Sequence, residues 1–293
     1  MTDRTQRWRE RRESFRRRGE AFDPSGFGVE LLDRHATARE FVTRHHYSGS
    51  WPSVSVCVGL YRRRLFFAPE LVGVCTFGTG ASQKSIPRWT GVPADEGLQL
   101  NRLVLLDEVP FNAETWTLAR AFAILQADRP RVRAVLSYSD PVPRRDEAGV
   151  VTMPGHVGAA YQAKGARYVG LSDPELKWLD ARGCLLDGRS LSKVRALDTG
   201  DPVKSKGGAA YARTLLALGA QPRRPHETWT RWVERITRGG EGPFTPLRHP
   251  GNHVYVFDPA GVANTLPDTT APARPYPKKD RAAAVVALRA ESV

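Results

Sequence analysis

Cysteine is scarce in this chain, and long apolar runs are absent. The 293 residues include three cysteines, Cys57, Cys75 and Cys184, which are widely spaced and form no CxxC pair. Neither a disulfide framework nor a zinc site of the usual spacing is therefore indicated. No apolar run approaches the length of a bilayer crossing, and the N-terminal segment lacks the apolar stretch of a secretory signal. These absences predict a globular protein with reduced thiols that stays in the cytoplasm.

Acidic residues are also in the minority. The chain has 44 lysines and arginines against 31 aspartates and glutamates, which leaves a formal net charge of +13. Such an excess favours a polyanionic partner, because basic side chains bind phosphates and release their counterions. Arginine dominates the count, however, and the coding preference of a GC-rich genome would produce the same excess. The charge therefore points to nucleic acid without specifying the kind.

An apolar segment that ends in polar residues is the most informative part of the sequence. Val132 to Leu136 has the composition of an interior strand, and it runs directly into Ser137, Tyr138 and Asp140 before Pro141. Ligands of open α/β sheets collect beyond such strand ends. The alternative is that Ser137 and Asp140 only form a turn, since these side chains often bond neighbouring backbone amides.

A short helix and a further strand are predicted after the following loop. The segment from His156 to Lys164 is rich in small residues and carries Tyr161, Gly165 ends it, and Tyr168 opens the next strand. A tyrosine on such a helix can face the same cleft as Asp140. It can equally pack in the core with its hydroxyl at the rim.

A charged residue interrupts another predicted strand. Leu98 to Leu106 is apolar except for Gln99, Asn101 and Arg102. A charge inside a strand is costly unless a partner compensates it. Two partners stay open: a neighbouring carboxylate, or an anionic group of a substrate or cofactor.

The helix that follows this strand offers an anion site. Asn112 is expected to cap it, and Glu114 and Thr115 fall in its first turn. The free amides of that turn suit a pyrophosphate. Glu114 opposes such a charge, however, and no Gly-rich cradle is present.

The remaining strands are predicted from their apolar, β-branched composition. They cover Val54 to Tyr61, Leu71 to Phe77, and His249 to Phe257, and a basic turn at Arg62 to Arg64 joins the first two. A helix is expected to end near His46 and to give way to a Gly- and Ser-rich loop.

Two basic regions each allow two interpretations. Residues 1–20 carry eight arginines with glutamates between them, a pattern that suits a solvated helix and a phosphate-binding arm equally. In the stretch from Gly183 to Arg248, basic residues alternate with Trp229 and Trp232. That mixture suits backbone phosphates and stacked bases, whereas the alternative is a helical layer whose tryptophans pack inward.

Four short motifs and the order of elements carry a family resemblance. The motifs are His46-Tyr47-Ser48, Leu100-Asn101-Arg102-Leu103, Ser137-Tyr138-Ser139-Asp140, and Gly155-His156-Val157-Gly158 followed by Tyr161. The order of predicted strands and helices is similar to the acyl-CoA-binding fold of the GCN5-related N-acetyltransferases. The motifs more closely resemble the phage Mom family of DNA-modifying proteins, over about residues 35 to 170.

This resemblance implies a fold, an activity and partners. The fold is α/β (α+β), with a mixed central sheet flanked by helices. The activity converts the N6 amine of DNA adenine to a carbamoylmethylated adenine, which shields phage DNA from restriction nucleases, and a phage-encoded protein would act in the host cytoplasm. Acetyl-CoA or a related acyl-CoA is the implied cofactor, iron is an implied metal, and DNA is the implied partner.

The resemblance also implies site residues. The functional positions of relatives correspond here to Tyr47, Arg102, Ser137, Asp140 and Tyr161. The acyl-CoA site would comprise Arg102, Leu103 and Val104 of the strand with Asn112, Ala113, Glu114 and Thr115 of the following helix. PFNAET stands where ordinary acetyltransferases have a Gly-rich pyrophosphate loop, a departure expected of this family.

Each predicted site residue has an expected role. Asp140 would orient or deprotonate the adenine amine, and Arg102 would hold a CoA phosphate or a developing negative charge. Tyr47 and Tyr161 would donate a proton or hydrogen-bond the base. Tyr47, Trp51 or Trp89 are the candidates to stack on a base extruded from the duplex, and each has a core-packing alternative.

Three histidines are the candidate ligands for iron. His45, His46 and His156 offer ring nitrogens, and Asp140 offers carboxylate oxygens beside them, which suit that metal. Adjacent histidines on a loop rarely bind one ion, so surface histidines or core histidines of fixed tautomer are the alternative.

The chain is expected to contain four segments. They are an Arg-rich N-terminal arm over residues 1–25, an acetyltransferase-like catalytic core over 26–182, a basic helical extension with a returning strand over 183–258, and a mostly disordered tail over 259–293. Two other functions stay open. One is an N-acetyltransferase that acts on a small amine or a protein lysine, and the other is a non-catalytic basic DNA-binding protein.

Overall fold

A computed structural model describes residues 4–9, 12–17, 21–33, 35–80, 82, 84–261 and 266–278. The described residues form two compact units. The first comprises the described parts of Met1–Pro143, Met153–Asp173 and Gly251–Leu288, and the second those of Arg144–Thr152 and Pro174–Pro250. The chain therefore leaves the first unit twice and returns to it at Met153 and again at Gly251.

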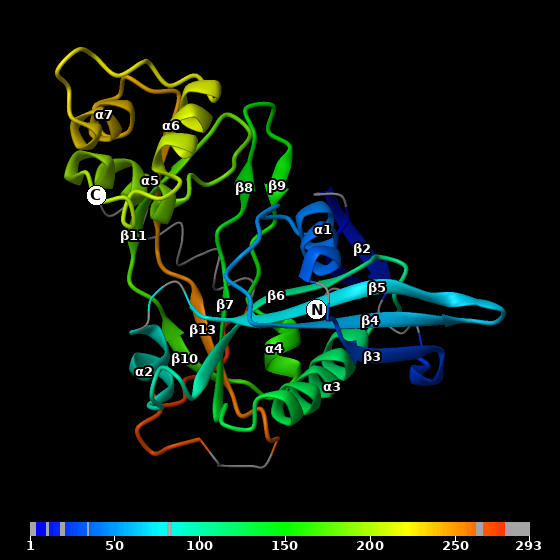
Figure 1. Cartoon of the computed structure of the whole chain (residues 1–293). Helices are drawn as coiled ribbons and strands as arrows, with labels where there is room; N and C mark the ends of the chain where they lie inside the picture. The colour runs from blue at the N-terminus through cyan, green and yellow to red at the C-terminus, as the bar shows by residue number, and fades with distance from the viewer. Residues whose placement is uncertain are drawn as a thin grey trace. The chain divides into compact units, whose positions relative to one another are not determined.

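A seven-stranded mixed sheet forms the centre of the first unit (Figure 1). Its strands, from one edge to the other, are β10 (Arg167–Leu171), β13 (His253–Phe257), β7 (Ala134–Ser139), β6 (Gly97–Leu105), β5 (Phe67–Gly78), β4 (Val56–Arg64) and β3 (Phe27–Leu31). Only β6 and β7 run parallel, and the other neighbours are antiparallel. A parallel pair needs a crossover, which α3 (Ala113–Asp128) supplies. The predicted α/β class with a mixed central sheet is confirmed.

Helices cover both faces of this sheet (Figure 1). On one face, Leu118 and Phe122 of α3 and Tyr161 of α4 (Ala159–Ala163) belong to one buried cluster that includes Phe77 of β5. On the other face, Val42 of α1 (His35–His45) packs against strand side chains that point to the opposite side of the sheet. A second helix on that face, α2 (Ser85–Thr90), lies in the Gly- and Ser-rich stretch between β5 and β6. The alternation of side chains along each strand therefore supplies apolar contacts to both layers.

Two of the three cysteines are part of this packing. Cys57 and Cys75 are fully buried in neighbouring strands, whereas Cys184 of the second unit is exposed. Burial raises the pKa of the Cys57 thiol to about 11 and also raises the pKa of Cys75. Both strand cysteines are therefore neutral thiols at physiological pH.

β6 has an irregularity at the point where it leaves β7. Its register with β5 passes from Arg102↔Thr76 to Leu100↔Phe77, so that Asn101 is an extra residue in β6. Leu100↔Ser137 is also the last pair between β6 and β7. Such a β-bulge bends the strand and redirects side chains, and it accounts for the polar residues in an otherwise apolar strand.

Several element boundaries differ from the sequence predictions. The arginines from Arg62 to Arg64 end β4, and the turn follows them at Leu65 and Phe66. The helix predicted from His156 is shorter and begins at Ala159, because Gly158 takes a positive φ of 69°. The strand predicted over His249 to Phe257 is two strands, β12 (Thr245–His249) and β13, since Pro250 and Gly251 interrupt it.

Within residues 4–9 and 12–17, the N-terminal arginines lie in strands. β1 (Arg4–Arg9) and β2 (Arg12–Arg17) pair antiparallel, so the solvated helix, one of the two interpretations of this segment, is not what the backbone forms. A 3-10 turn, η1 (Pro24–Gly26), then leads into β3, which the sequence did not reveal.

The second unit is mostly helical and has a core of its own. Leu191, Leu215, Trp232 and Ile236 form its buried cluster. Its elements are β8 (Arg144–Arg145), β9 (Val151–Met153, of which Met153 belongs to the first unit), β11 (Glu175–Leu179), α5 (Gly188–Arg195), η2 (Ala196–Thr199), α6 (Gly208–Ala217), α7 (Trp229–Ile236) and β12. The strands pair as β8 with β9 and β11 with β12.

The chain after β13 lies partly outside the described residues. Within residues 266–278, Arg274 donates its backbone N–H to the Tyr168 carbonyl at 2.8 Å, and the Tyr276 hydroxyl donates to the Ala166 carbonyl at 2.7 Å. Thr270 donates its hydroxyl to the Thr90 carbonyl at 2.7 Å. This segment therefore follows the first unit closely. Across the described part of the chain, no helix combines the length and the apolarity that a membrane span needs.

Candidate active site

Arg102 projects from the bulge of β6 and has no acidic partner among the described residues. Its guanidinium donates to the Asn101 carbonyl at 2.7 Å and to the Ser50 hydroxyl at 3.0 Å, while Nε is buried without a partner. Burial lowers the pKa of Arg102, and the nearby phenols of Tyr47 and Tyr161 oppose that shift. The sequence left two partners open for Arg102, a neighbouring carboxylate or an anionic group of a ligand. Among the described residues, no carboxylate pairs with it.

Tyr161 lies in the core beside Arg102 and Ser137. Its side chain is buried, it is hydrogen-bonded to the Ser137 side chain, and burial raises its pKa. The Ser137 hydroxyl also donates weakly to the Leu100 carbonyl, at 3.4 Å. Tyr161 is therefore a protonated phenol at neutral pH, held at the last residue pair that joins β6 to β7.

The loop before α4 depends on glycine. Gly155 has a φ of +66°, and a Cβ there would lie 2.5 Å from the Pro141 carbonyl oxygen. This close approach lets the His156 backbone N–H donate to the Asp140 carbonyl at 2.8 Å. The glycine at position 155 therefore allows the loop to pack closely against the end of β7.

Tyr47 lies next to two histidines. Its ring centroid is 4.1 Å from that of His46 and 6.2 Å from that of His156. His46 is buried, and burial together with the positive charges of Arg102 and His156 holds its pKa well below the usual range. The His46 ring is therefore neutral at physiological pH. Tyr47 itself is half-buried, so part of its surface stays accessible.

Asp140 forms a turn at the end of β7. Its Oδ1 accepts the Val142 backbone N–H at 2.9 Å, as expected for a turn-forming aspartate. Its charge also raises the pKa of His253, although burial is the larger effect and lowers that pKa to about 4. His253 and His156 likewise interact electrostatically, so a histidine pair links Asp140 to Tyr47.

The sequence did not identify three residues that line this region. His253 of β13 pairs with Ser139 of β7, and the His253 Nε2 and Ser139 Oγ atoms are both buried without a hydrogen-bond partner. Ser50 contacts Arg102 from the loop after α1. The only signal in the sequence for Ser139 was its place in the Ser-Tyr-Ser-Asp segment, and none marked His253.

Four of the five predicted catalytic residues form one connected group, and the fifth is linked to it indirectly. Tyr47, Arg102, Ser137 and Tyr161 are joined by hydrogen bonds or direct electrostatic interactions. Asp140 joins this group through His253 and His156. The arrangement combines a fixed cation, a protonated phenol and a carboxylate, which are groups that can bind an anion and transfer a proton.

The residues expected to bind acyl-CoA lie where β6 ends and α3 begins. The side chains of Val104 and Ala113 are buried in the core, so only their backbone groups are available to a ligand. Glu114 and Thr115 lie in the first turn as predicted. Asn112 precedes the helix but does not cap it with its side chain, because its φ of 71° places it in the left-handed region.

This strand-to-helix junction fits an acyl-CoA. The first amides of an α-helix have no intrahelical acceptor, and α3 has sixteen residues with the dipole that suits a pyrophosphate. Arg102, earlier in the same strand, has a buried Nε without a hydrogen-bond partner. Glu114 is the one acidic residue in the first turn of α3 and opposes such a ligand.

The histidines do not fit an iron site. Across the described residues, no group of three or more histidine, cysteine, aspartate or glutamate side chains could hold a metal ion. His46 Nδ1 accepts the Ser48 backbone N–H at 3.1 Å, so in the neutral ring the proton is on Nε2 and neither nitrogen has a free lone pair. The His45 ring lies beside the Phe41 ring, with centroids 4.7 Å apart and the two planes tilted by 49°.

The second unit contains basic residues of two kinds. Arg235 is buried in a network with Glu227 and Glu241, at 2.7 Å and 3.1 Å respectively, and the network lowers the pKa of Glu227 to about 2. Lys206, Arg213 and Arg231 are exposed, and no carboxylate of the described residues pairs with them. Trp232 is buried and packs inward. This agrees with the second interpretation of this region, a helical layer whose tryptophans form its core.

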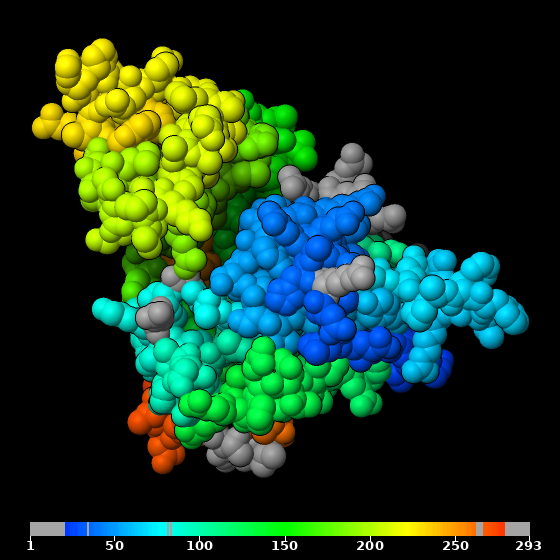
Figure 2. Space-filling view, in the orientation of Figure 1, coloured from blue at the N-terminus to red at the C-terminus, as the bar shows by residue number. Residues whose placement is uncertain are grey.

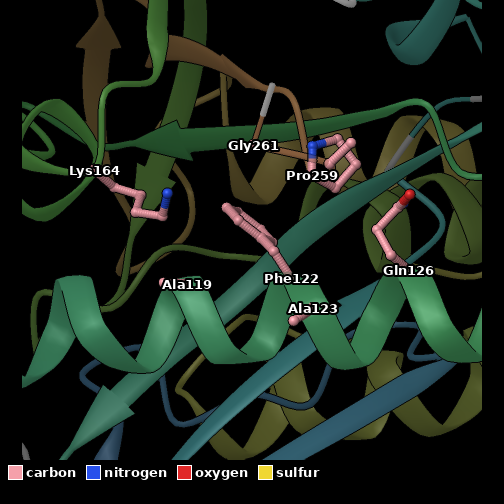
Figure 3. A pocket seen from close by; sticks show the side chains of 8 residues that line it. Ala119, Phe122, Ala123, Gln126, Lys164, Pro259 and Gly261 are labelled. Carbon is pink, nitrogen blue, oxygen red and sulfur yellow. The ribbon is translucent and has the colours of Figure 1, made fainter. Parts of the chain in front are cut away.

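A pocket lies away from these groups, beside α3 (Figure 3). Phe122, Gln126 and Lys164 line it, together with Pro259 to Gly261. None of the predicted catalytic residues contributes to it, and residues 262–265 next to it are outside the described part of the chain. The pocket is therefore not the candidate active site.

Comparisons with known proteins give one family match. A model described as the Mom protein family matches residues 27–200. No curated protein matches the sequence. Among solved structures, a tandem GNAT protein from the clavulanic acid biosynthesis pathway, without AcCoA, is similar with a TM-score of 0.37 and 9% identity, over 80% of this chain and 98% of that one.

Proposed function

Because the chain belongs to the Mom protein family, we propose that it is an acyl-CoA-dependent transferase that converts adenine N6 in DNA to a carbamoylmethylated adenine. The modification would protect the DNA from restriction nucleases. The observation that supports this proposal most is the group formed by Arg102, Tyr161, Ser137 and Tyr47 where β6 and β7 part. The motifs that carry the family resemblance contribute every member of that group.

The proposed acyl-CoA site is the junction of β6 and α3. Arg102 would bind an anionic group of the cofactor, and the first amides of α3 would bind its pyrophosphate. When bound, the cofactor supplies an activated acyl group as a thioester. Acyl transfer alone does not install the carbamoyl nitrogen or the methylene link, so the complete modification includes a further step. The described residues offer no fitting iron site, and no step is assigned to a metal.

The adenine amine requires help from the protein. Its lone pair is delocalised into the ring, so the enzyme must position it and accept a proton. Asp140 is the proposed group that orients or deprotonates the amine, because its carboxylate follows β7 directly and interacts electrostatically with His253. Tyr161 is the proposed proton donor, because burial keeps its phenol protonated.

The adenine must also leave the duplex, since its amine is otherwise inside the base stack. Tyr47 is the proposed residue that meets the extruded base. It is half-buried, interacts electrostatically with Arg102 and contacts the His156 ring edge-on. Trp51 and Trp89 pack against the apolar layers on the α1 and α2 face of the sheet, which favours a core role for both.

Mass spectrometry of nucleosides tests the proposal directly. DNA from cells that express the protein should contain a new adenosine species, and Asp140→Ala and Tyr161→Phe should lose it. Asp95→Asn is the matched control, because Asp95 is exposed and forms a surface ion pair with Arg131. A new adenosine species that persists in Asp140→Ala would contradict the proposed role of Asp140 as the group that orients or deprotonates the amine. Unmodified DNA together with acetylation of free amines would instead identify a small-amine or lysine N-acetyltransferase.

A further inference from the structure

The turn between β4 and β5 exposes three consecutive apolar side chains. Leu65 is 84% exposed, Phe66 97% and Phe67 73%. Figure 2 shows this hairpin standing out from the rest of the first unit, so the side chains contact water. Three large apolar residues in a row at such a tip are unusual for a soluble surface and indicate a binding partner.

The conformation of Phe66 strengthens this inference. Its φ is +71°, a region that glycine and asparagine adopt readily and that bulky residues disfavour. A glycine at this position would form the same turn without steric cost. The phenyl ring is therefore not explained by the needs of the fold, since it is both disfavoured there and almost fully exposed.

The charges next to the tip favour an anionic partner. Arg62, Arg63 and Arg64 precede the apolar residues. Arg62 and Arg64 share the single carboxylate of Glu70, at 3.8 Å and 2.7 Å. Arg63 donates to the Ser25 carbonyl at 3.1 Å and has no acidic partner among the described residues. The hairpin end therefore combines an apolar tip with uncompensated positive charge.

We propose that this tip, Leu65 to Phe67 with Arg62 to Arg64, is a wedge that docks on duplex DNA about one helical turn from the modified adenine. The inference rests on the proposed function, which makes DNA the partner. The arginines bind backbone phosphates, and the ring of Phe66 enters a groove and inserts between base pairs, as apolar side chains of groove-binding proteins do. This contact is separate from the group around Arg102.

The length of the hairpin sets the spacing of the two contacts. Phe67 and Phe77 are at opposite ends of β5, and at about 3.3 Å per residue they lie roughly 33 Å apart. Phe77 is next to the β6 bulge. One turn of B-DNA is about 34 Å long, so a duplex that runs along β5 from an adenine held near the β6 bulge would meet the wedge about ten base pairs away.

The first test replaces the ring without harming the turn. Phe66→Gly should keep the melting temperature of the protein, because glycine adopts the positive φ freely, and should weaken binding to a 24-base-pair duplex about tenfold. Phe66→Asn is a second variant with the same tolerance of positive φ. Val150→Ser is the control: Val150 is 61% exposed in another hairpin, next to Asp146 and Glu147. Unchanged DNA affinity in both Phe66 variants overturns the proposal.

Salt dependence separates the two kinds of contact. Arg63→Ala should reduce the slope of log affinity against log salt by about 0.9, the value for one phosphate contact, whereas Phe66→Gly should leave the slope unchanged. Arg131→Ala, at an exposed ion pair with Asp95, is the control. A slope that Arg63→Ala does not change would contradict the phosphate contact.

Duplex length tests the spacing. The wild-type affinity should rise between duplexes of about 10 and 24 base pairs, and Phe66→Gly should lack that rise. Phe66-dependent binding to anionic vesicles without an effect on DNA, or Phe66-dependent self-association in sedimentation, would overturn the proposal in favour of those partners. Phe66-dependent DNA binding by a protein that leaves adenine unmodified would refute the proposed function alone and leave the wedge intact.

Discussion

Burial sets the protonation states of the residues around Arg102. It raises the pKa of Tyr161, and it lowers the pKa of His46 and of His253, the latter to about 4. At neutral pH the phenol is therefore protonated and both imidazoles are neutral. Arg102 consequently supplies positive charge to a region that would repel a second cation, which suits the binding of one anionic group.

The depressed pKa of His253 predicts a loss of stability in acid. Its value in the unfolded chain is about 6.5, so the unfolded state takes up a proton first as the pH falls. The contribution is complete above pH 6.5 and is lost as the pH falls through 4, because folding must then exclude that proton. The wild type should lose up to about 1.4 kcal/mol per pH unit from this residue.

Denaturant unfolding between pH 7 and pH 4 measures this effect. The unfolding free energy of His253→Gln should fall less steeply with decreasing pH than that of the wild type. The difference in slope should be at most the value for one bound proton, about 1.4 kcal/mol per pH unit. His35→Gln is the control, since His35 is exposed at the start of α1. Equal slopes for His253→Gln and the wild type would show that the buried imidazole does not exclude a proton.

At the level of elements, the loop from Gly155 to Gly158 positions the end of β7. Gly155→Ala would combine an unfavourable positive φ with a Cβ only 2.5 Å from the Pro141 carbonyl oxygen. We expect a loss of about 2 to 4 kcal/mol in unfolding free energy. Gly165→Ala is the control, because Gly165 has a φ of +83° with open space around it, and it should lose only about 1 kcal/mol. Equal losses would mean that the loop shifts freely.

The start of α3 gives a prediction for the cofactor. If the pyrophosphate of an acyl-CoA binds there, Glu114→Gln should increase the affinity for acetyl-CoA about two- to fivefold, because a negative charge leaves the first helical turn. Asp128→Asn, at the other end of the helix, should have no such effect. Calorimetric titration of each variant measures the change, and an unchanged affinity in Glu114→Gln would place the pyrophosphate elsewhere.

The sequence predicted the strands around the site better than their neighbours. The positions of β5, β6 and β7 followed from runs of apolar residues, and Arg102 and Ser137 were marked by polarity inside such runs. His253 could not be found in this way, because it reaches Ser139 only through the insertion of β13 between β7 and β10. A pairing between segments so distant in the chain leaves no local pattern. The helix α2 was missed because glycine and serine surround it.

At the scale of the whole molecule, two cores imply two sets of stability determinants. Trp232 is 1% exposed in the core of the second unit, and none of its cluster belongs to the first. Trp232→Ala should destabilise that unit by about 3 to 5 kcal/mol. Differential scanning calorimetry should show a transition that moves down for Trp232→Ala, while Phe122→Ala should lower a different one. One shared transition that moves equally for both variants would contradict independent cores.

Because two of the three cysteines are buried, the native protein has a single accessible thiol. The thiols of Cys57 and Cys75 are held neutral inside the sheet, whereas Cys184 is exposed in the second unit. A maleimide dye should therefore attach at Cys184 alone without any engineered substitution. Energy transfer from that dye to labelled ends of an oligonucleotide would then report how a bound nucleic acid lies relative to the second unit.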